Sequence, residues 1–245
     1  MVKASAASFT GVFTALVTPM RAGDGGPVVD DAGLARLVEV QVAAGVQGLV
    51  ACGTTGEAAT LTAEEQARVV RVVVEAAAGR VPVLAGVGSP STTTSLSLGK
   101  AALSVGATGL LAVTPYYNRP PQEGLFQHFA ALCSLGAPIV LYNVPGRTGC
   151  DLLPETVARL VERPEIVALK EASGSVLRMQ SLSRLVGQRL SLLSGEDALN
   201  FPLYAVGASG TVSVLSNVAP KATVEVWNRF ANGQHAEALA LHQRL

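Results

Sequence analysis

Residues that commonly build metal centres or disulfide frameworks are scarce in this sequence. Among its 245 residues are three cysteines (Cys52, Cys133 and Cys150) and three histidines. The cysteines are odd in number and form no CxxC pair, so reduced thiols are expected rather than a disulfide framework. The histidines form no HxH or HxxxH pair, which leaves few ligands for a transition metal. We therefore expect no metal site.

Neither sign of charge is in excess, and no hydrophobic run is long. The 18 basic and 18 acidic residues give a formal net charge of zero, which implies no polyelectrolyte partner such as nucleic acid. No apolar run approaches the roughly 18 residues of a membrane span, and residues 1–8 lack the apolar core of a signal peptide. We expect a soluble, cytoplasmic protein that binds neither nucleic acid nor membranes.

Small and branched apolar residues are what the sequence has in abundance. It is 49% hydrophobic with 25 glycines but only 4% aromatic residues, a composition typical of an α/β fold with both faces of the sheet covered. The length suits one α/β barrel or two small domains, and no linker divides the chain. Eight apolar strand patterns alternate with helical ones, which favours a (β/α)₈ TIM barrel over an open doubly wound sheet. The expected strands are residues 12–17, 48–51, 81–86, 109–113, 139–142, 167–170, 190–194 and 210–214.

Local signals mark several of the intervening helices. Thr62 and Glu65 have the spacing of a capping box. Pro121 and Pro154 precede helical patterns and are expected in the first helical turn. Residues 218–245 indicate one or two further helices. We therefore expect an N-terminal tail (residues 1–8), the barrel (residues 9–217) and the start of a C-terminal helical region (residues 218–245).

Lys170 is the residue that most needs a chemical explanation. It ends the apolar run 166–169, where burial disfavours the ammonium form and lowers the pKa from its reference value of about 10.4. The other lysines (Lys3, Lys100 and Lys221) lie in the tail or in helix-like stretches, where solvation is expected. A neutral amine is a nucleophile, so Lys170 is the candidate for Schiff-base formation with a carbonyl substrate.

The carboxyl ends of the strands meet at one mouth of such a barrel, where the reacting groups lie. Tyr142 ends the strand before that of Lys170, so its phenol is a candidate proton shuttle; the alternative is an interior tyrosine bonded to the backbone. Glu171 follows Lys170 and faces the other side of the strand, so a structural ion pair outside the barrel is expected. These ends contain no carboxylate pair for glycosidase chemistry and no Ser/His/Asp arrangement.

Two segments offer groups for a substrate carboxylate. The run Gly53–Glu57 places the hydroxyls of Thr54 and Thr55 and free backbone amides just before a helix, where amides and helix dipole favour an anion. An ordinary Thr-capped turn is the alternative. Arg147 lies in a Pro- and Gly-bounded loop, from which it could clamp a carboxylate with two hydrogen bonds; a surface ion pair is the alternative.

Five segments together resemble the dihydrodipicolinate synthases, also called 4-hydroxy-tetrahydrodipicolinate synthases. The resemblance runs in order, with nearly constant spacing, from about Phe9 to the last residue. The segments are GTTGEAATL (53–61), TPYYNRPPQEGL (114–125), YNVPGRTGCDLLPETV (142–157), LKEASG (169–174) and LLSGED (192–197).

The resemblance implies a homotetrameric barrel lyase, a dimer of dimers, that condenses pyruvate with L-aspartate 4-semialdehyde on the route to diaminopimelate and lysine, without metal or organic cofactor. By motif, Lys170 matches the Schiff-base lysine, and Thr54, Tyr117 and Tyr142 match a proton relay in which Tyr117 reaches the neighbouring subunit's site. The positions that match substrate-binding residues are Thr54 and Thr55 for the pyruvate carboxylate, Arg147 for the semialdehyde carboxylate, the pocket position Val212, and Gly195 at a strand end.

The sequence departs from the family pattern at its C-terminal end. Family members usually continue past the point that matches Leu245 with further helices, so most of that helical extension is expected to be missing here. Those helices contribute to subunit contacts and flank the active site. Tetramer formation is therefore the family property that this difference is most expected to affect.

A second departure concerns feedback inhibition by L-lysine. Family members that bind lysine at the dimer interface use polar residues, and the matching positions here retain only Tyr116. We therefore predict weak or absent inhibition by L-lysine, and an inhibition constant well below millimolar in a steady-state assay would contradict this. The replaced positions are Ala58, Ala63, Gln66, Pro90 and Thr94.

Two other functions stay open at this stage. Another pyruvate-dependent lyase of the same superfamily, such as an N-acetylneuraminate lyase or a 2-keto-3-deoxy-sugar acid aldolase, would share Lys170 and Tyr142. Arg147 and the Tyr116–Tyr117 pair favour the semialdehyde substrate. A catalytically idle barrel kept for assembly or ligand binding is the alternative from another class, and the intact set of relay residues argues against it.

Overall fold

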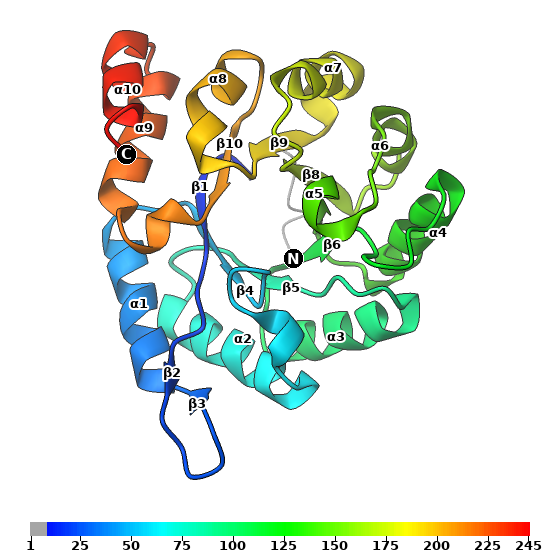
Figure 1. Cartoon of the computed structure of the whole chain (residues 1–245), viewed down its shortest axis with the longest axis vertical. Helices are drawn as coiled ribbons and strands as arrows, with labels where there is room; N and C mark the ends of the chain where they lie inside the picture. Colours follow the sequence, from blue (N-terminus) through cyan, green and yellow to red (C-terminus); the bar gives the residue numbers. More distant parts are fainter. Residues whose placement is uncertain (1–8) are drawn as a thin grey trace.

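The computed structural model describes residues 9–245, and its centre is a closed barrel of eight parallel strands (Figure 1). Around the barrel the strands follow the order β1-β10-β9-β8-β7-β6-β5-β4, and β4 pairs with β1 to close it. The eight-stranded prediction is confirmed, with boundaries that shift by at most two residues. The strands are β1 (Gly11–Ala15), β4 (Gly48–Ala51), β5 (Val83–Gly86), β6 (Gly109–Val113), β7 (Ile139–Asn143), β8 (Ile166–Glu171), β9 (Ser191–Ser194) and β10 (Gly210–Ser213).

Helices follow the barrel strands and form a ring outside them (Figure 1). A small antiparallel pair, β2 (Met20–Arg21) and β3 (Val28–Val29), projects between β1 and the first helix. The helices are α1 (Asp31–Ala43), α2 (Ala63–Ala77), α3 (Thr92–Ser104), α4 (Gln122–Leu132), α5 (Pro145–Thr148), α6 (Pro154–Leu160), α7 (Val176–Val186), α8 (Asn200–Ala205), α9 (Pro220–Ala231) and α10 (His235–His242). Short 3₁₀ segments lie at Ala58–Thr60, Cys133–Leu135, Gly187–Arg189, Asp197–Leu199 and Leu215–Asn217.

The two faces of the strands build two separate apolar layers. Successive side chains alternate between the faces, and the strands are buried on both. Leu141 and Leu169 point outward and pack with the helices, whereas Val140 and Leu193 fill the barrel interior. This alternation sends Lys170 into the barrel and Glu171 out of it. Glu171 pairs with Arg178 of α7 at 2.9 Å, which confirms the predicted outer ion pair.

The local helix signals were mostly correct. Thr62 and Glu65 form the expected capping box at the start of α2, and Pro154 lies in the first turn of α6. Pro121 is one position earlier than predicted: it is the N-cap of α4, outside the first turn. The segment that contains Arg147 was expected as a loop but forms the short helix α5, because Pro145 supplies a helical φ at its first position.

The end of the chain forms two helices, as expected. α9 and α10 lie beside α8 and α1 in Figure 1. Aromatic rings join them to α8: Tyr204 meets Trp227 edge to face with centroids 5.0 Å apart, and Phe201 meets Phe230 at 5.5 Å. The three cysteines are free and buried, in agreement with the prediction of reduced thiols. The predicted tail, residues 1–8, lies outside the described residues.

Within residues 9–245, none of the helices is both long and apolar enough to span a membrane.

Candidate active site

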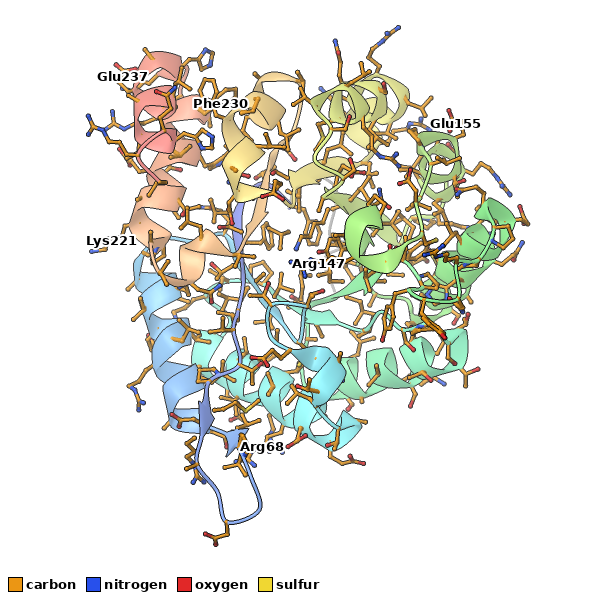
Figure 2. The ribbon with its side chains drawn as sticks, in the orientation of Figure 1. Arg68, Arg147, Glu155, Lys221, Phe230 and Glu237 are labelled. Atoms are coloured by element: carbon orange, nitrogen blue, oxygen red, sulfur yellow. The ribbon has the colours of Figure 1, made fainter. Side chains whose placement is uncertain are left out.

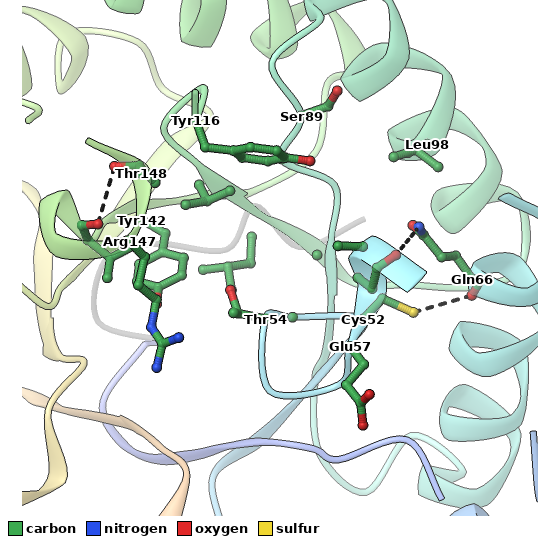
Figure 3. A pocket seen from close by; sticks show the side chains of 18 of the residues that line it. Cys52, Thr54, Glu57, Gln66, Ser89, Leu98, Tyr116, Tyr142, Arg147 and Thr148 are labelled. Atoms are coloured by element: carbon green, nitrogen blue, oxygen red, sulfur yellow. Dashed lines mark hydrogen bonds between the residues drawn. The ribbon is translucent and has the colours of Figure 1, made fainter. Parts of the chain in front are cut away.

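The mouth at the carboxyl ends of the strands contains a cavity of about 430 Å³. Its walls come from the turns after β4, β5, β6 and β7. Figure 3 shows Tyr142 and Arg147 together on one side of this cavity and Cys52, Glu57 and Gln66 on another. Candidate residues far apart in the sequence thus meet in one place, as parallel strands in a closed barrel require.

Lys170 lies at the base of this mouth, beside Tyr142. The two residues are partners in the register of β7 and β8, and the Lys170 Nζ lies 4.2 Å from the centroid of the Tyr142 ring. Lys170 is 4% exposed and is not among the residues that line the cavity. Burial lowers its pKa to about 8. The negative charges of Asp197 and Glu196 oppose this shift, and the positive charge of Arg147 adds to it. The predicted depression of the lysine pKa is confirmed, and its main cause is desolvation.

The phenol of Tyr142 faces the hydroxyl of Thr54. Burial raises the pKa of Tyr142, while the positive charge of Arg147 and a hydrogen bond from Thr54 act in the opposite direction. The hydrogen bonds found between residues 9 and 245 do not join the Tyr142 hydroxyl to the backbone, and its neighbour Thr54 is another candidate residue. A phenol with a raised pKa remains protonated near neutral pH and can donate to a developing oxyanion.

Gly195 and Val212 shape the surroundings of the lysine. A Cβ atom at Gly195 would lie 3.0 Å from Cε and 3.1 Å from Cγ of Lys170, and 2.7 Å from Cβ of Ala172. The absence of a side chain there leaves the channel that the lysine occupies. Val212 is 1% exposed and packs in the barrel interior with Tyr142, but it does not line the cavity.

The turn between Gly53 and Glu57 leaves backbone donors free. The amides of Gly56 and Glu57 donate within the turn, at 3.1 and 3.0 Å, whereas the hydrogen bonds of the described residues include none from the amides of Thr54 or Thr55. Thr54 lines the cavity and Thr55 does not. The prediction of a helix directly after the turn was wrong: the 3₁₀ segment Ala58–Thr60 intervenes, so the amides matter more than any helix dipole.

Arg147 extends from α5 toward the centre of the barrel mouth (Figure 2). It lines the cavity and is exposed, and the ion pairs found between residues 9 and 245 do not include it. The alternative of a surface ion pair is therefore not realised in the described part of the chain. A guanidinium without a carboxylate partner is available to a substrate carboxylate.

Tyr117 is the one relay candidate that the structure does not bring to Lys170. Its side chain is 92% exposed and does not line the cavity of its own chain, although its neighbour Tyr116 does. Its φ of 72° lies in the left-handed region, which is costly for a residue with a side chain. The Tyr117 amide donates to the carbonyl of Thr148 at 3.2 Å, which helps to hold this conformation.

Sequence reasoning missed Asp197 as part of the site. Its carboxylate accepts hydrogen bonds from the amides of Val214 and Leu215, both at 2.8 Å. Among the charged groups that shift the pKa of Lys170, Asp197 has the largest effect. The available signal was its position, three residues beyond the end of β9 at the barrel mouth. In the part of the chain that the structure describes, His, Cys, Asp and Glu side chains form no group of three that could hold a metal ion.

The rate of imine formation by Lys170 is predicted to rise with pH, with its inflection near pH 8 and a plateau about one pH unit higher. Because the folded-state pKa is lowered to about 8, the neutral amine is a tenth of the total one pH unit below this value and predominates one unit above it. Stopped-flow mixing with a carbonyl compound across pH 6 to 9.5 would measure the inflection. A rate that still rises about tenfold per pH unit up to pH 9.5 would show an ordinary lysine pKa near 10.5 and would contradict the buried, desolvated lysine.

An eight-stranded barrel with a buried, pKa-lowered lysine beside a tyrosine at its carboxyl mouth is the arrangement of a barrel enzyme with a nucleophilic amine. The family model described as the dihydrodipicolinate synthetase family matches residues 8–245. The chain belongs to this family.

Relatives and solved structures agree with the family match. A protein of Sorangium cellulosum named 4-hydroxy-tetrahydrodipicolinate synthase is 51% identical, over 96% of this chain and 78% of its own length. The dihydrodipicolinate synthase structure from Aquifex aeolicus superimposes with a TM-score of 0.93 at 38% identity, covering 97% of this chain and 80% of that one. The Acinetobacter baumannii dihydrodipicolinate synthase, solved in complex with pyruvate, gives a TM-score of 0.91 at 43% identity, covering 96% of this chain and 80% of that one.

Proposed function

We propose that this chain condenses pyruvate with L-aspartate 4-semialdehyde to give 4-hydroxy-tetrahydrodipicolinate, the activity for which its relatives are named. The observation that carries the proposal is the pair formed by Lys170 and Tyr142, with the lysine amine 4.2 Å from the ring centroid and its pKa lowered to about 8. A desolvated amine beside a protonated phenol has the two properties that imine chemistry needs: a nucleophile and a proton donor.

The proposed reaction begins when the neutral amine of Lys170 attacks the ketone carbon of pyruvate. Tyr142, beside Thr54, donates a proton to the resulting oxyanion, and loss of water gives the imine. Loss of a proton from the pyruvate methyl group gives an enamine, whose carbon attacks the aldehyde of the second substrate. The amino group of that substrate then displaces Lys170 as the ring closes. One water leaves in the net reaction, and the amine is regenerated.

Binding of the two substrates is assigned to the groups that remain free at the mouth. The amides and hydroxyls of Thr54 and Thr55 would hold the carboxylate of pyruvate, since a run of free backbone donors suits an anion. Arg147 would hold the carboxylate of the semialdehyde by two parallel hydrogen bonds. Gly195 would leave room beside the imine, and Val212 would form part of the apolar interior to which Tyr142 belongs.

We also propose that Tyr117 acts across a subunit interface in a homotetramer. A 92% exposed tyrosine held at a φ of 72° has no function within its own cavity, and the family resemblance assigns it to a neighbouring site. Sedimentation velocity at catalytic concentrations would report the assembly. A monomer with full activity would contradict this role.

The experiment that tests the function is intact-protein mass after incubation with pyruvate and borohydride, followed by an assay with aspartate semialdehyde. A reduced adduct on the chain, together with turnover of the semialdehyde, supports the proposal. An adduct without turnover of this aldehyde would point to another pyruvate-dependent lyase. No adduct would support the catalytically idle barrel.

A further inference from the structure

A buried polar network lies outside the barrel wall, directly behind the Lys170–Tyr142 pair. Where β7 pairs with β8, Asn143 lies opposite Glu171, one position beyond the reacting pair. Because side chains alternate along a strand, these two residues point away from the barrel interior. Both are buried, and Asn143 Nδ2 donates to Glu171 Oε2 at 3.1 Å. Each network residue is thus the chain neighbour of a reacting residue: Asn143 follows Tyr142 on β7, and Glu171 follows Lys170 on β8.

Arg178 of α7 ties this network to the chain that follows α5. Its Nε donates to Glu171 Oε2 at 2.9 Å, its Nη1 donates to Asp151 Oδ2 at 3.0 Å, and its Nη2 donates to the carbonyl of Leu152. The side chain of Arg178 is 14% exposed and that of Glu171 is 2% exposed. Charge-assisted hydrogen bonds of this kind are shorter and stronger than neutral ones.

The segment of residues 144–152 is held at both of its ends by this network. The segment begins directly after Asn143, at the end of β7. Its last residue returns to the side chain of Asn143, because Asn143 Oδ1 accepts a hydrogen bond from the amide of Leu152 at 2.9 Å. Asn143 Nδ2 also donates to Asp151 Oδ1 at 3.0 Å. Arg147 lies inside this closed segment. Its placement over the barrel mouth therefore depends on how firmly the returning end is held.

The main charges that shift the pKa of Lys170 belong to Asp197, Arg147 and Glu196, not to the network residues Glu171 and Arg178. Lys170 is also held by parallel pairing on both sides of β8. Arg147 lies in α5, outside the strand pairing, where Thr148 bonds to the Tyr117 amide and the network holds the returning end at Asp151 and Leu152. Loss of the network would therefore disturb Arg147 more than Lys170.

We propose that Arg178 is a positioning residue for the second substrate, because it holds segment 144–152 and thereby keeps Arg147 oriented over the barrel mouth. The inference rests on the proposed function, in which Arg147 receives the carboxylate of the aldehyde substrate.

The test compares Arg178→Met with Arg159→Met as a matched control. Arg159 of α6 also pairs with a carboxylate, that of Glu123, at 2.8 Å. Its side chain is half exposed, and this ion pair involves no residue of the network. In Arg178→Met the KM for aspartate semialdehyde is expected to rise about tenfold or more, whereas the KM for pyruvate and the yield of the borohydride-trapped adduct change less than about twofold. The control is expected to match the native chain. A purely structural role would lower the active fraction and leave both KM values unchanged, which would overturn the inference.

A second readout needs no substrate. Hydrogen–deuterium exchange at the amide of Leu152 is expected to be faster in Arg178→Met and in Asp151→Ala, with Arg178→Lys between these variants and the native chain. If Arg178→Met does not fold, Asp151→Ala carries both measurements, because the side chain of Asp151 is 39% exposed and its loss is better tolerated. Unchanged exchange in the variants would overturn the positioning role. If the native chain forms no pyruvate adduct, the proposed function fails, and the exchange result still decides the structural claim.

Discussion

Lys170→Met is expected to abolish the pyruvate adduct and to lower kcat/KM by about 10⁴-fold or more. Methionine has a similar length and fits the channel that Gly195 leaves open, but it has no nucleophilic nitrogen. Intact-protein mass after borohydride treatment and a steady-state assay would measure both effects. Lys100→Met, which removes an exposed lysine from α3, is the matched control and is expected to retain the adduct.

The same variant is expected to be more stable than the native chain near neutral pH. The pKa of Lys170 is lowered from 10.5 to about 8 on folding, so the folded state disfavours the ammonium form. This cost is fully present below pH 8 and is relieved as the pH rises from 8 toward 10.5, because the unfolded chain binds more protons in that window. Removal of the amine should therefore raise the free energy of unfolding on the order of 3 kcal/mol at pH 7, and much less at pH 10.

Thermal unfolding at several pH values would test this link between stability and activity. A higher Tm for Lys170→Met at pH 7, with a difference that shrinks above pH 8, is the expected pattern. An equal or lower Tm at pH 7 would mean that the buried amine carries no folding cost. The lysine would then be ionised and solvated, and the basis of its nucleophilicity would be lost.

Tyr142→Phe is expected to lower kcat by about 10² to 10⁴-fold, the range typical of a lost general acid or base. Phenylalanine keeps the ring against the Lys170 amine, 4.2 Å from its centroid in the native chain, so the change removes only the hydroxyl. The pyruvate adduct should still form, but slowly, because dehydration of the carbinolamine has lost its proton donor. Single-turnover kinetics with pyruvate would show a slow imine phase.

Tyr116→Phe is the matched control, since Tyr116 lines the same cavity without a place in the relay. Its kcat is expected to stay within about twofold of the native value. A further check is Thr54→Val, alone and combined with Tyr142→Phe. Because Thr54 lowers the pKa of the Tyr142 phenol, the two changes should be far less than additive, as for residues that act as one unit. Full additivity would show that Thr54 acts elsewhere.

Much of the barrel could be predicted because its signals are local. Short apolar strands, the Thr62 capping box and the first-turn Pro154 depend on neighbours in the sequence, and each was found where expected. The errors are also local in origin. Pro121 sits one position before the first turn, and the chain around Arg147 coils into α5, because helix boundaries depend on small differences between adjacent backbone conformations.

Sequence patterns indicated several candidate residues at the barrel mouth but not the geometry that relates them. Period-two alternation alone places Lys170 inside the barrel and Glu171 outside it. No sequence pattern predicted that Arg178, on the following helix, joins Glu171 to Asp151. That contact depends on how α7 packs against the outside of the barrel. The outward direction of Tyr117 was likewise beyond local reasoning, and its role in a neighbouring subunit stays a prediction of the family resemblance.

The sequence by itself determined the order of strands and helices, the opposite directions of Lys170 and Glu171, and the family that the chain resembles. Only the tertiary structure decided that Tyr142 lies against the amine of Lys170, that the amine is desolvated enough to lower its pKa to about 8, and that a guanidinium outside the wall holds the segment with Arg147. The physical reason is closure of the barrel. Burial and register join residues from different strands only when the sheet meets itself, and the distances and pKa values of the site follow from that packing.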